Sequence, residues 1–238
     1  MEPFTDSPHD VEAADRAMEF SLGWFANPIF SGSGDYPQVM KEFIGDKSRR
    51  QGLTKSRLPE FTETEKRLIN GSADFLGVNH YTSRLVRHRP FPDSGPSHEH
   101  DQDLVTTADS CWPDTQAYWL SVNPWGIRSA LVWAQKRYRN PVIFIAENGR
   151  HTGTGLNDTE RIQYHYYYIN EVLKAIRLDG VNVRAYTAWT LMDNLEWSVG
   201  YSLKFGFYHV DFNSPQKTRI PKASVAFYRD LIHRNGFS

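Results

Sequence analysis

A single carboxylate stands at the end of an apolar run in the second half of the chain. Glu147 directly follows the five apolar residues 142–146 and precedes Asn148 and Gly149. A carboxylate in this position is either held at a strand tip, where it can act as a nucleophile or exchange protons, or is the first solvated residue of a turn. Glu147 by itself leaves both interpretations open.

Two indoles and a carboxylate lie close together in the segment 188–197, AWTLMDNLEW. Glu196 is next to Trp197, and Trp189 precedes both. Indoles on a loop are costly unless they stack on something, and sugars offer apolar C–H faces together with hydroxyls that carboxylates can hold. The segment therefore favours a sugar site, while the alternative is that both indoles only close the core.

Short apolar runs predict the strands that would position these groups. The runs Phe75–Tyr81, Val142–Ala146 and Val181–Trp189 are too short for helices and read as buried strands. Helical periodicity follows each run, which is typical of a parallel sheet with crossover helices. Ligands bind at the carboxyl ends of such strands, so we expect the polar residues that follow the three runs to meet at one rim.

Four helices are predicted, three of them with a defined inward face. The first covers residues 7–26 and begins at Ser7, and the last covers 221–234. For the helix after Asn123-Pro124, the inward residues are Ile127, Leu131, Ala134 and Tyr138. For the helix capped by Asn157 or Asp158, they are Ile162, Tyr166, Ile169, Leu173 and Ile176. For the last helix, they are Val225, Tyr228 and Ile232.

Two stretches have weaker patterns. Residues 27–72 are rich in turn formers such as Asn27-Pro28, with a short helix predicted near 63–68 after Thr62. Residues 84–122 have no clear period and are expected to form a long loop.

Composition excludes several classes of protein. The 238 residues carry 27 Lys and Arg against 28 Asp and Glu, a net charge of −1, which argues against a nucleic-acid-binding surface. No apolar run approaches the roughly 20 residues of a membrane span. The N-terminus MEPFTDSPHD lacks the features of a secretory signal, and Cys111 is the single cysteine, so a cytoplasmic location is the default expectation for the chain as written.

Metal and cofactor motifs are absent from the sequence. The nine histidines form no His-Glu-x-x-His pattern, and the glycine-rich turns lack the lysine of a phosphate-binding loop. We therefore expect neither a metal ion nor a cofactor.

Longer motifs resemble the family 1 glycoside hydrolases, in particular animal lactase-like and cytosolic β-glucosidase members. The matching segments are DFLGVNHYTSR (74–84), PVIFIAENG (141–149), AYTAWTLMDNLEWSVGYSLKFGFYHVDF (185–212) and RIPKAS (219–224). The resemblance implies a (β/α)8 TIM barrel and a retaining β-glycosidase that acts on a small-molecule β-glycoside.

The resemblance also implies roles for individual residues. Glu147 matches the nucleophile that attacks the anomeric carbon, and Tyr81 matches the tyrosine that orients this carboxylate. The remaining matched residues are expected to bind the sugar, and they are Asn79, Trp189, Glu196, Trp197 and Phe205.

One catalytic group of the family has no counterpart. A retaining glycosidase needs a second carboxyl group as acid and base, and the Asn-Glu-Pro motif that carries it in the family occurs nowhere in this chain. We therefore interpret residues 1–238 as one partial domain, the C-terminal part of the barrel with about three parallel strands and no closure. A longer parent protein could be secreted or membrane-anchored.

Two consequences follow from the missing part. Open sheet edges predict that the isolated chain is marginally stable, prone to aggregation or dependent on a partner, which could be the missing N-terminal half or an oligomer partner. One alternative function is a non-catalytic, klotho-like module that binds a sugar or a protein, and another interpretation of the isolated chain is an α/β fragment without activity.

Overall fold

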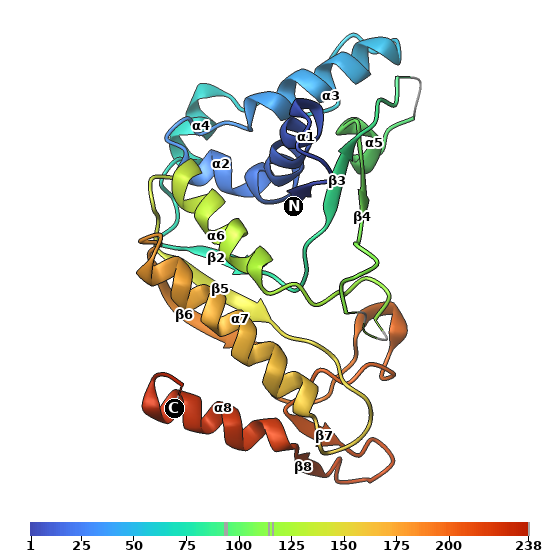
Figure 1. The fold of residues 1–238 in the computed structure, drawn as a ribbon. Coiled ribbons are helices and arrows are strands. Elements are labelled where there is room, and N and C mark those ends of the chain that lie inside the picture. Colours follow the sequence, from blue (N-terminus) through green and yellow to red (C-terminus); the bar gives the residue numbers. More distant parts are fainter. Residues whose placement is uncertain (93–94, 114, 116, 238) are drawn as a thin grey trace. The chain divides into compact units, whose positions relative to one another are not determined.

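The structure is a computed structural model, and it describes residues 1–92, 95–113, 115 and 117–237 (Figure 1). The chain divides into two compact units, each assembled from segments that are distant in sequence. The first comprises Met1–Leu76, Ser83–Ser110 and Trp133–Val142, and the second comprises Gly77–Thr82, Cys111–Val132 and Ile143–Ser238.

The first unit begins with the predicted helix, but that helix changes form before it ends. α1 (Pro8–Met18) starts at Ser7, whose hydroxyl accepts a hydrogen bond from the Asp10 amide, as expected of an N-cap. A π-helical turn follows at Glu19–Gly23, and α2 (Trp24–Phe30) continues through Pro28. The helix was predicted to end before Asn27-Pro28 and instead includes Pro28 near its C-terminal end, where the proline ring removes one helical hydrogen bond without ending the helix.

The stretch 27–72 contains two helices where one was predicted. α4 (Glu63–Ile69) confirms the expected helix, and Thr62 and Glu65 form a reciprocal capping box at its start. α3 (Gln38–Arg50) was not predicted, since its sequence is mostly polar. Its few apolar side chains nevertheless join one buried cluster, which consists of Phe20, Met40, Ile44 and Leu58.

The expected loop 84–122 contains regular structure. β3 (Leu85–His88) pairs in parallel with β1 (Glu2–Pro3) and antiparallel with β4 (Leu104–Thr107), and α5 (His98–Asp101) lies between β3 and β4 in the chain. Each of these elements is four residues or shorter. Such short elements have no detectable period, and long-range pairing stabilises them.

The predicted parallel sheet is present, in the order β2-β5-β6. Its strands are β2 (Leu76–Asn79), β5 (Ile143–Asn148) and β6 (Val183–Ala188), which confirms the three expected strands. β5 and β6 run parallel, with Ile143 opposite Val183 and Asn148 opposite Ala188. In the described part of the chain the sheet does not close, and β2 and β6 are its edges.

The helices after these strands are where predicted, but two inward faces differ. α6 (Trp125–Arg137) buries its predicted face, since Ile127, Leu131, Ala134 and Tyr138 are each at most 3% exposed. α7 (Thr159–Arg177) turns its aliphatic stripe outward, with Leu173 42% exposed, and buries a largely polar and aromatic face instead. That buried face comprises Arg161, Tyr164, His165, Tyr168, Val172 and Ala175.

α8 (Ala223–Arg234) follows a short hairpin and lies alongside α7, which packs against β6 (Figure 1). Ile232 of α8 is 65% exposed, contrary to its predicted inward position. The hairpin consists of β7 (Tyr208–Val210) and β8 (Arg219–Pro221), and a 3-10 turn at Trp197–Val199 precedes it.

Candidate active site

The second unit contains a hollow of about 570 Å³ beyond the carboxyl ends of the parallel strands. All seven residues predicted from the sequence line it, namely Asn79, Tyr81, Glu147, Trp189, Glu196, Trp197 and Phe205. Three lining residues were not predicted, and they are Trp119, Asn194 and Leu195. The structure thus brings together residues from three strand ends and two loops.

A tyrosine hydroxyl holds the central carboxylate. The Tyr81 hydroxyl donates a hydrogen bond of 2.7 Å to Glu147 Oε2. Burial raises the pKa of Tyr81, and the hydrogen bond and negative charge of Glu147 raise it further. Tyr81 is therefore a permanent donor at neutral pH, and it fixes one oxygen of Glu147 in place.

The backbone around Glu147 is fixed by its neighbouring strands. The Glu147 carbonyl accepts from the His80 amide at 2.9 Å, and the Asn148 carbonyl accepts from the Trp189 amide at 2.8 Å. A Cβ atom on Gly149 would lie 1.9 Å from the Trp189 carbonyl oxygen. Only glycine at 149 allows the strand end that carries Glu147 to approach the one that carries Trp189 this closely.

A buried hydrogen-bond network lies behind Tyr81 and Glu147. The Asn148 side-chain amide donates to the His80 carbonyl at 2.6 Å and to the Tyr164 hydroxyl at 3.0 Å. The Tyr164 and Tyr168 hydroxyls in turn donate to the Tyr81 carbonyl at 2.9 and 3.1 Å. We name this set of five residues the tyrosine network. Its hydrogen bonds connect helix α7 to the carboxyl ends of β2 and β5, which carry Tyr81 and Glu147.

The indole and carboxylate of segment 188–197 contact each other. Trp189 Nε1 donates to Glu196 Oε1 at 3.3 Å. Burial raises the pKa of Glu196, and the charges of Glu147 and Asp193 add to this. Trp197 is 90% exposed and lies at the mouth of the hollow.

Asp193 anchors the loop that carries Glu196. One of its oxygens accepts from Lys222 Nζ and from the Gly206 amide, each at 2.9 Å. The side chains of Asp193 and Lys222 are fully buried. A buried ion pair that is also hydrogen-bonded to the backbone fixes this loop relative to the segment before β7.

Aromatic rings form a wall of the hollow. Trp119 and Phe205 are stacked, with ring centroids 6.4 Å apart, and Tyr81 packs edge-on against both. Trp119 was missed because it lies in a stretch without periodicity. Its one available sign was the density of tryptophans between residues 112 and 125.

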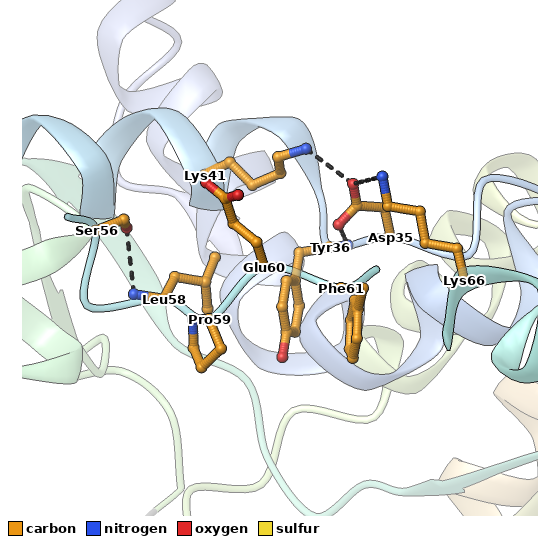
Figure 2. Close-up of a pocket in the computed structure, with 9 residues that line it drawn as sticks. All are labelled: Asp35, Tyr36, Lys41, Ser56, Leu58, Pro59, Glu60, Phe61 and Lys66. Atoms are coloured by element: carbon orange, nitrogen blue, oxygen red, sulfur yellow. Dashed lines mark hydrogen bonds and ion pairs between the residues drawn. The ribbon is translucent and has the colours of Figure 1, made fainter. Parts of the chain in front are cut away.

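A second hollow, of about 260 Å³, lies in the first unit (Figure 2). Figure 2 shows the Asp35 carboxylate held by two ammonium groups, those of Lys41 at 2.9 Å and Lys66 at 3.2 Å. Beside them the rings of Tyr36 and Phe61 stack at 4.5 Å. Because its paired carboxylate is already neutralised, this hollow is better explained as a structural junction than as a catalytic site.

The described part of the chain offers neither a metal site nor a membrane-spanning helix. Within residues 1–92, 95–113, 115 and 117–237, no group of three His, Cys, Asp or Glu side chains could hold a metal ion. Over the same ranges, no helix combines the length and the apolar character needed to cross a bilayer.

Comparison with known proteins identifies the class to which this fold and site belong. The family model described as "Glycosyl hydrolase family 1" matches residues 1–237, so the chain belongs to this family. Among curated relatives, the human lactase-like protein is 51% identical over 235 residues, covering 97% of this chain and 41% of the relative. Human cytosolic beta-glucosidase is 43% identical, covering 97% of this chain and 49% of the relative.

Solved structures give the same result for the fold. An aphid myrosinase aligns with a TM-score of 0.90 at 39% identity, covering 98% of this chain and 50% of that one. A rice beta-glucosidase aligns with a TM-score of 0.86 at 36% identity, covering 97% and 48%. The chain therefore spans about half the length of these relatives, and its fold is that of part of a TIM barrel, as predicted.

Proposed function

We propose that the chain carries the nucleophile and the sugar-binding side of a retaining β-glycosidase site that hydrolyses β-glucosides or β-galactosides. The observation that supports this most is the hydrogen bond from Tyr81 to Glu147 in a hollow that also contains Trp189 and Glu196. Family membership supports the same reaction class.

In the proposed reaction, Glu147 attacks the anomeric carbon of the sugar. A bond forms between a carboxylate oxygen and that carbon while the bond to the leaving-group oxygen breaks, which gives a glycosyl ester. Tyr81 holds Oε2 and leaves Oε1 for the attack. Water then hydrolyses the ester, and an acid and base must first protonate the leaving oxygen and later activate the water.

The sugar ring is proposed to lie against Trp189, with Glu196 accepting hydrogen bonds from its hydroxyls. A buried carboxylate that loses a hydroxyl partner is left unsatisfied, which makes such contacts selective. Asn79, Trp197 and Phe205 are proposed as the remaining contacts, and all three line the same hollow.

A second candidate function is a klotho-like module that binds without catalysis. The observation that favours it is the composition of the hollow, because Glu147 and Glu196 are the acids among its described lining residues and Glu196 is engaged with Trp189. With no evident acid and base, we expect no turnover of ordinary aryl glycosides by the chain alone.

A mechanism-based probe distinguishes the two candidates. The probe is a 2-fluoro glycoside with a dinitrophenyl leaving group. This group departs as a stable phenolate, so ester formation needs no general acid. We expect intact-protein mass spectrometry to show one 2-fluoroglycosyl group, mapped by peptide analysis to Glu147. Glu147→Gln should stay unlabelled, and Glu12→Gln, an exposed change on α1, should label normally.

The binding alternative gives a different result. A folded chain that remains unlabelled, yet binds a monosaccharide in calorimetry and loses that binding in Glu196→Ala, would support a non-catalytic module. A folded chain that neither labels nor binds would contradict both proposals for this hollow.

A further inference from the structure

The pairing of β5 with β6 is irregular at the strand end that carries Glu147. Ile145 lies opposite Tyr186 and Asn148 lies opposite Ala188, so three steps along β5 match two steps along β6. Such a bulge leaves one residue out of the regular pairing and changes the direction of its neighbours. Pairing with β6 therefore does not by itself fix the position of Glu147, and other contacts must do so.

The side chain of Asn148, the residue after Glu147, provides such contacts. It is fully buried, and its amide nitrogen donates to the His80 carbonyl and to the Tyr164 hydroxyl, as described for the tyrosine network. Its oxygen, Oδ1, accepts a hydrogen bond of 2.5 Å from the Tyr186 hydroxyl of β6. Both ends of the Asn148 amide are thus occupied, which fixes the orientation of the side chain.

The Tyr186 hydroxyl has a second partner, and the number of hydrogens determines which atom donates. The Tyr186 oxygen lies 2.9 Å from His165 Nδ1 of α7. A tyrosine hydroxyl has one hydrogen, and here it goes to Asn148 Oδ1, which can only accept. His165 Nδ1 must then carry a hydrogen and donate it to Tyr186. The opposite tautomer would draw the Tyr186 hydrogen away and leave a buried amide oxygen without a donor.

The surroundings of His165 agree with this tautomer. The rings of Phe207 and Tyr228 pack against it, with centroids 5.3 and 5.8 Å away, and Nε2 is buried without a hydrogen-bond partner in the described part of the chain. Burial lowers the pKa of His165 to about 3, so the ring is neutral and carries a single hydrogen at neutral pH. Tyr186 is thus the one acceptor toward which this hydrogen can point.

The same series of hydrogen bonds continues to the carboxylate in the hollow. Asn148 donates to Tyr164, whose hydroxyl donates to the Tyr81 carbonyl at 2.9 Å. The Tyr81 hydroxyl in turn holds Glu147. The series therefore begins at His165, on the helix behind the sheet, and ends on the carboxylate.

We infer that His165 and Tyr186 are positioning residues of the proposed site. By fixing the Asn148 amide, they hold the strand ends that carry Tyr81 and Glu147 in the geometry that attack requires. Neither is among the described residues that line the hollow, so neither is placed to contact the sugar. The inference rests on the proposed function and extends it to residues outside the hollow.

The effect should fall on attack rather than on sugar binding. The loop that carries Glu196 is anchored separately, by the buried pair of Asp193 and Lys222. Loss of the Tyr186 hydroxyl leaves that anchor intact. A variant at Tyr186 should therefore still bind the sugar and attack it more slowly.

Tyr186→Phe tests this, because it removes the hydroxyl and keeps the ring. Labelling of the full chain by the 2-fluoro glycoside, followed by intact mass at several probe concentrations, gives a maximal rate and a half-saturating concentration. We expect the maximal rate to fall about tenfold and the half-saturating concentration to change less than about twofold, because a small misplacement slows attack without weakening binding. An unchanged maximal rate would overturn the inference.

Phe207→Leu is the matched control. It shortens a ring stacked on His165 and removes no hydrogen bond. It should lower the free energy of unfolding by an amount comparable to Tyr186→Phe, yet keep the maximal labelling rate within about twofold of the wild type. Equal losses of labelling rate in the two variants would show a purely structural role and would also overturn the inference.

The tautomer of His165 is a readout that a purely structural role would not move. Long-range ¹H–¹⁵N spectra of the full chain, assigned by the loss of signals in His165→Gln, should show the hydrogen on Nδ1. In Tyr186→Phe, where Nδ1 loses its acceptor, we expect a mixture of both tautomers. A hydrogen on Nε2 in the wild type would contradict the proposed direction of the hydrogen bonds.

Hydrogen exchange separates this inference from the proposed function. If the folded wild type does not label, the proposed function fails, and exchange at the His80 and Trp189 amides, which bond to Glu147 and Asn148, decides the inference. Tyr186→Phe should speed exchange there about tenfold relative to the Ile145 amide. Phe207→Leu should affect all three amides alike. Absence of the local acceleration in Tyr186→Phe would show that the strand ends do not depend on this hydroxyl.

Discussion

Both the side-chain hydroxyl and the backbone carbonyl of Tyr81 are hydrogen-bonded, and this determines how well Tyr81 can orient Glu147. Its hydroxyl donates to the carboxylate, while its carbonyl accepts from Tyr164 and Tyr168 of α7. The rings of Tyr164 and Tyr168 stack with centroids 3.9 Å apart, so each fixes the other. A donor fixed in this way keeps its direction without reorganising when substrate binds.

Removing one hydroxyl from the tyrosine network should cost stability. Tyr164→Phe leaves the Asn148 amide without one acceptor and the Tyr81 carbonyl with one donor fewer, inside the core. We expect the free energy of unfolding to fall by about 1 to 3 kcal/mol, measured by urea denaturation. Tyr166→Phe, two residues away and 44% exposed, should change it by less than about 0.5 kcal/mol. Equal effects of the two changes would contradict the network.

Glu196 should reduce stability at neutral pH, since burial penalises its charged form and raises its pKa. A carboxyl group whose folded pKa is raised binds protons more readily in the folded state, so its ionisation destabilises the fold at pH values above that raised pKa. Glu196→Gln should therefore raise the melting temperature at pH 7.5 by a few degrees, and the gain should vanish below about pH 4, where both states carry a neutral group.

The control for this change is Glu12→Gln, which alters an exposed carboxylate on α1. It should give no such pH-dependent difference in melting temperature. If Glu196→Gln lowered the melting temperature at pH 7.5, the carboxylate would be stabilising the fold, and the direction inferred for its pKa would be wrong.

At the scale of elements, one carboxylate joins the starts of two helices. Asp158 precedes α7, pairs with the fully buried Arg161, and accepts from the Ser224 amide at 2.8 Å and the Ser224 hydroxyl at 2.5 Å at the start of α8. Arg161 also donates to the Lys204 carbonyl at 2.6 Å. The pair thus fixes the positions of α7, the loop before Phe205 and the start of α8 relative to one another.

Removing the charge of Asp158 should be strongly destabilising. Asp158→Asn leaves the buried guanidinium of Arg161 without its counter-ion, which costs about 3 to 5 kcal/mol in comparable cases. Urea denaturation measures the change. Asp179→Asn is the control, because its ion pair with Arg128 is partly exposed and should contribute about 1 kcal/mol or less. Similar losses for the two variants would show that burial of the Asp158 pair is unimportant.

At the scale of the whole molecule, two histidines with buried ring nitrogens should make the fold sensitive to acid. Burial lowers the pKa of His80 and of His165 to about 3, from an ordinary value of 6.5. His165 is packed among the rings of Tyr186, Phe207 and Tyr228, with the charge of Arg161 opposing its protonation. Neither histidine can take up a proton in the fold near neutral pH.

Stability should therefore fall as pH drops below about 6.5. In that range the unfolded chain binds protons at both histidines and the folded chain does not, which costs about 1.4 kcal/mol per pH unit for each histidine. Urea denaturation at pH 7.5, 6.5 and 5.5 measures the slope. The exposed His233, replaced by Gln, should leave the slope unchanged, and a flat profile between pH 7.5 and 5.5 would contradict the burial of both rings.

The sequence by itself determined the features that depend on neighbouring residues. The Ser7 cap and the Thr62–Glu65 capping box are local, as are the short apolar runs that became β2, β5 and β6. Because parallel strands share the direction of their carboxyl ends, the sequence also predicted that the groups after the three strands, among them Tyr81, Glu147 and Glu196, would share one rim. These groups line one hollow together with Phe205, which only the family resemblance had indicated. Their roles in binding and catalysis remain proposals.

The tertiary structure alone decided features that depend on partners far away in the chain. Hydrophobicity favoured the aliphatic stripe of α7 as its inward face, yet the helix buries Tyr164, His165 and Tyr168. The two tyrosine hydroxyls and the His165 Nδ1 atom find partners at Tyr81, Asn123 and Tyr186. A polar face can be buried where distant groups satisfy its hydrogen bonds, and local periodicity carries no information about those groups. For the same reason the pairing of β1 with β3 and the place of Trp119 in the wall emerged only from the fold.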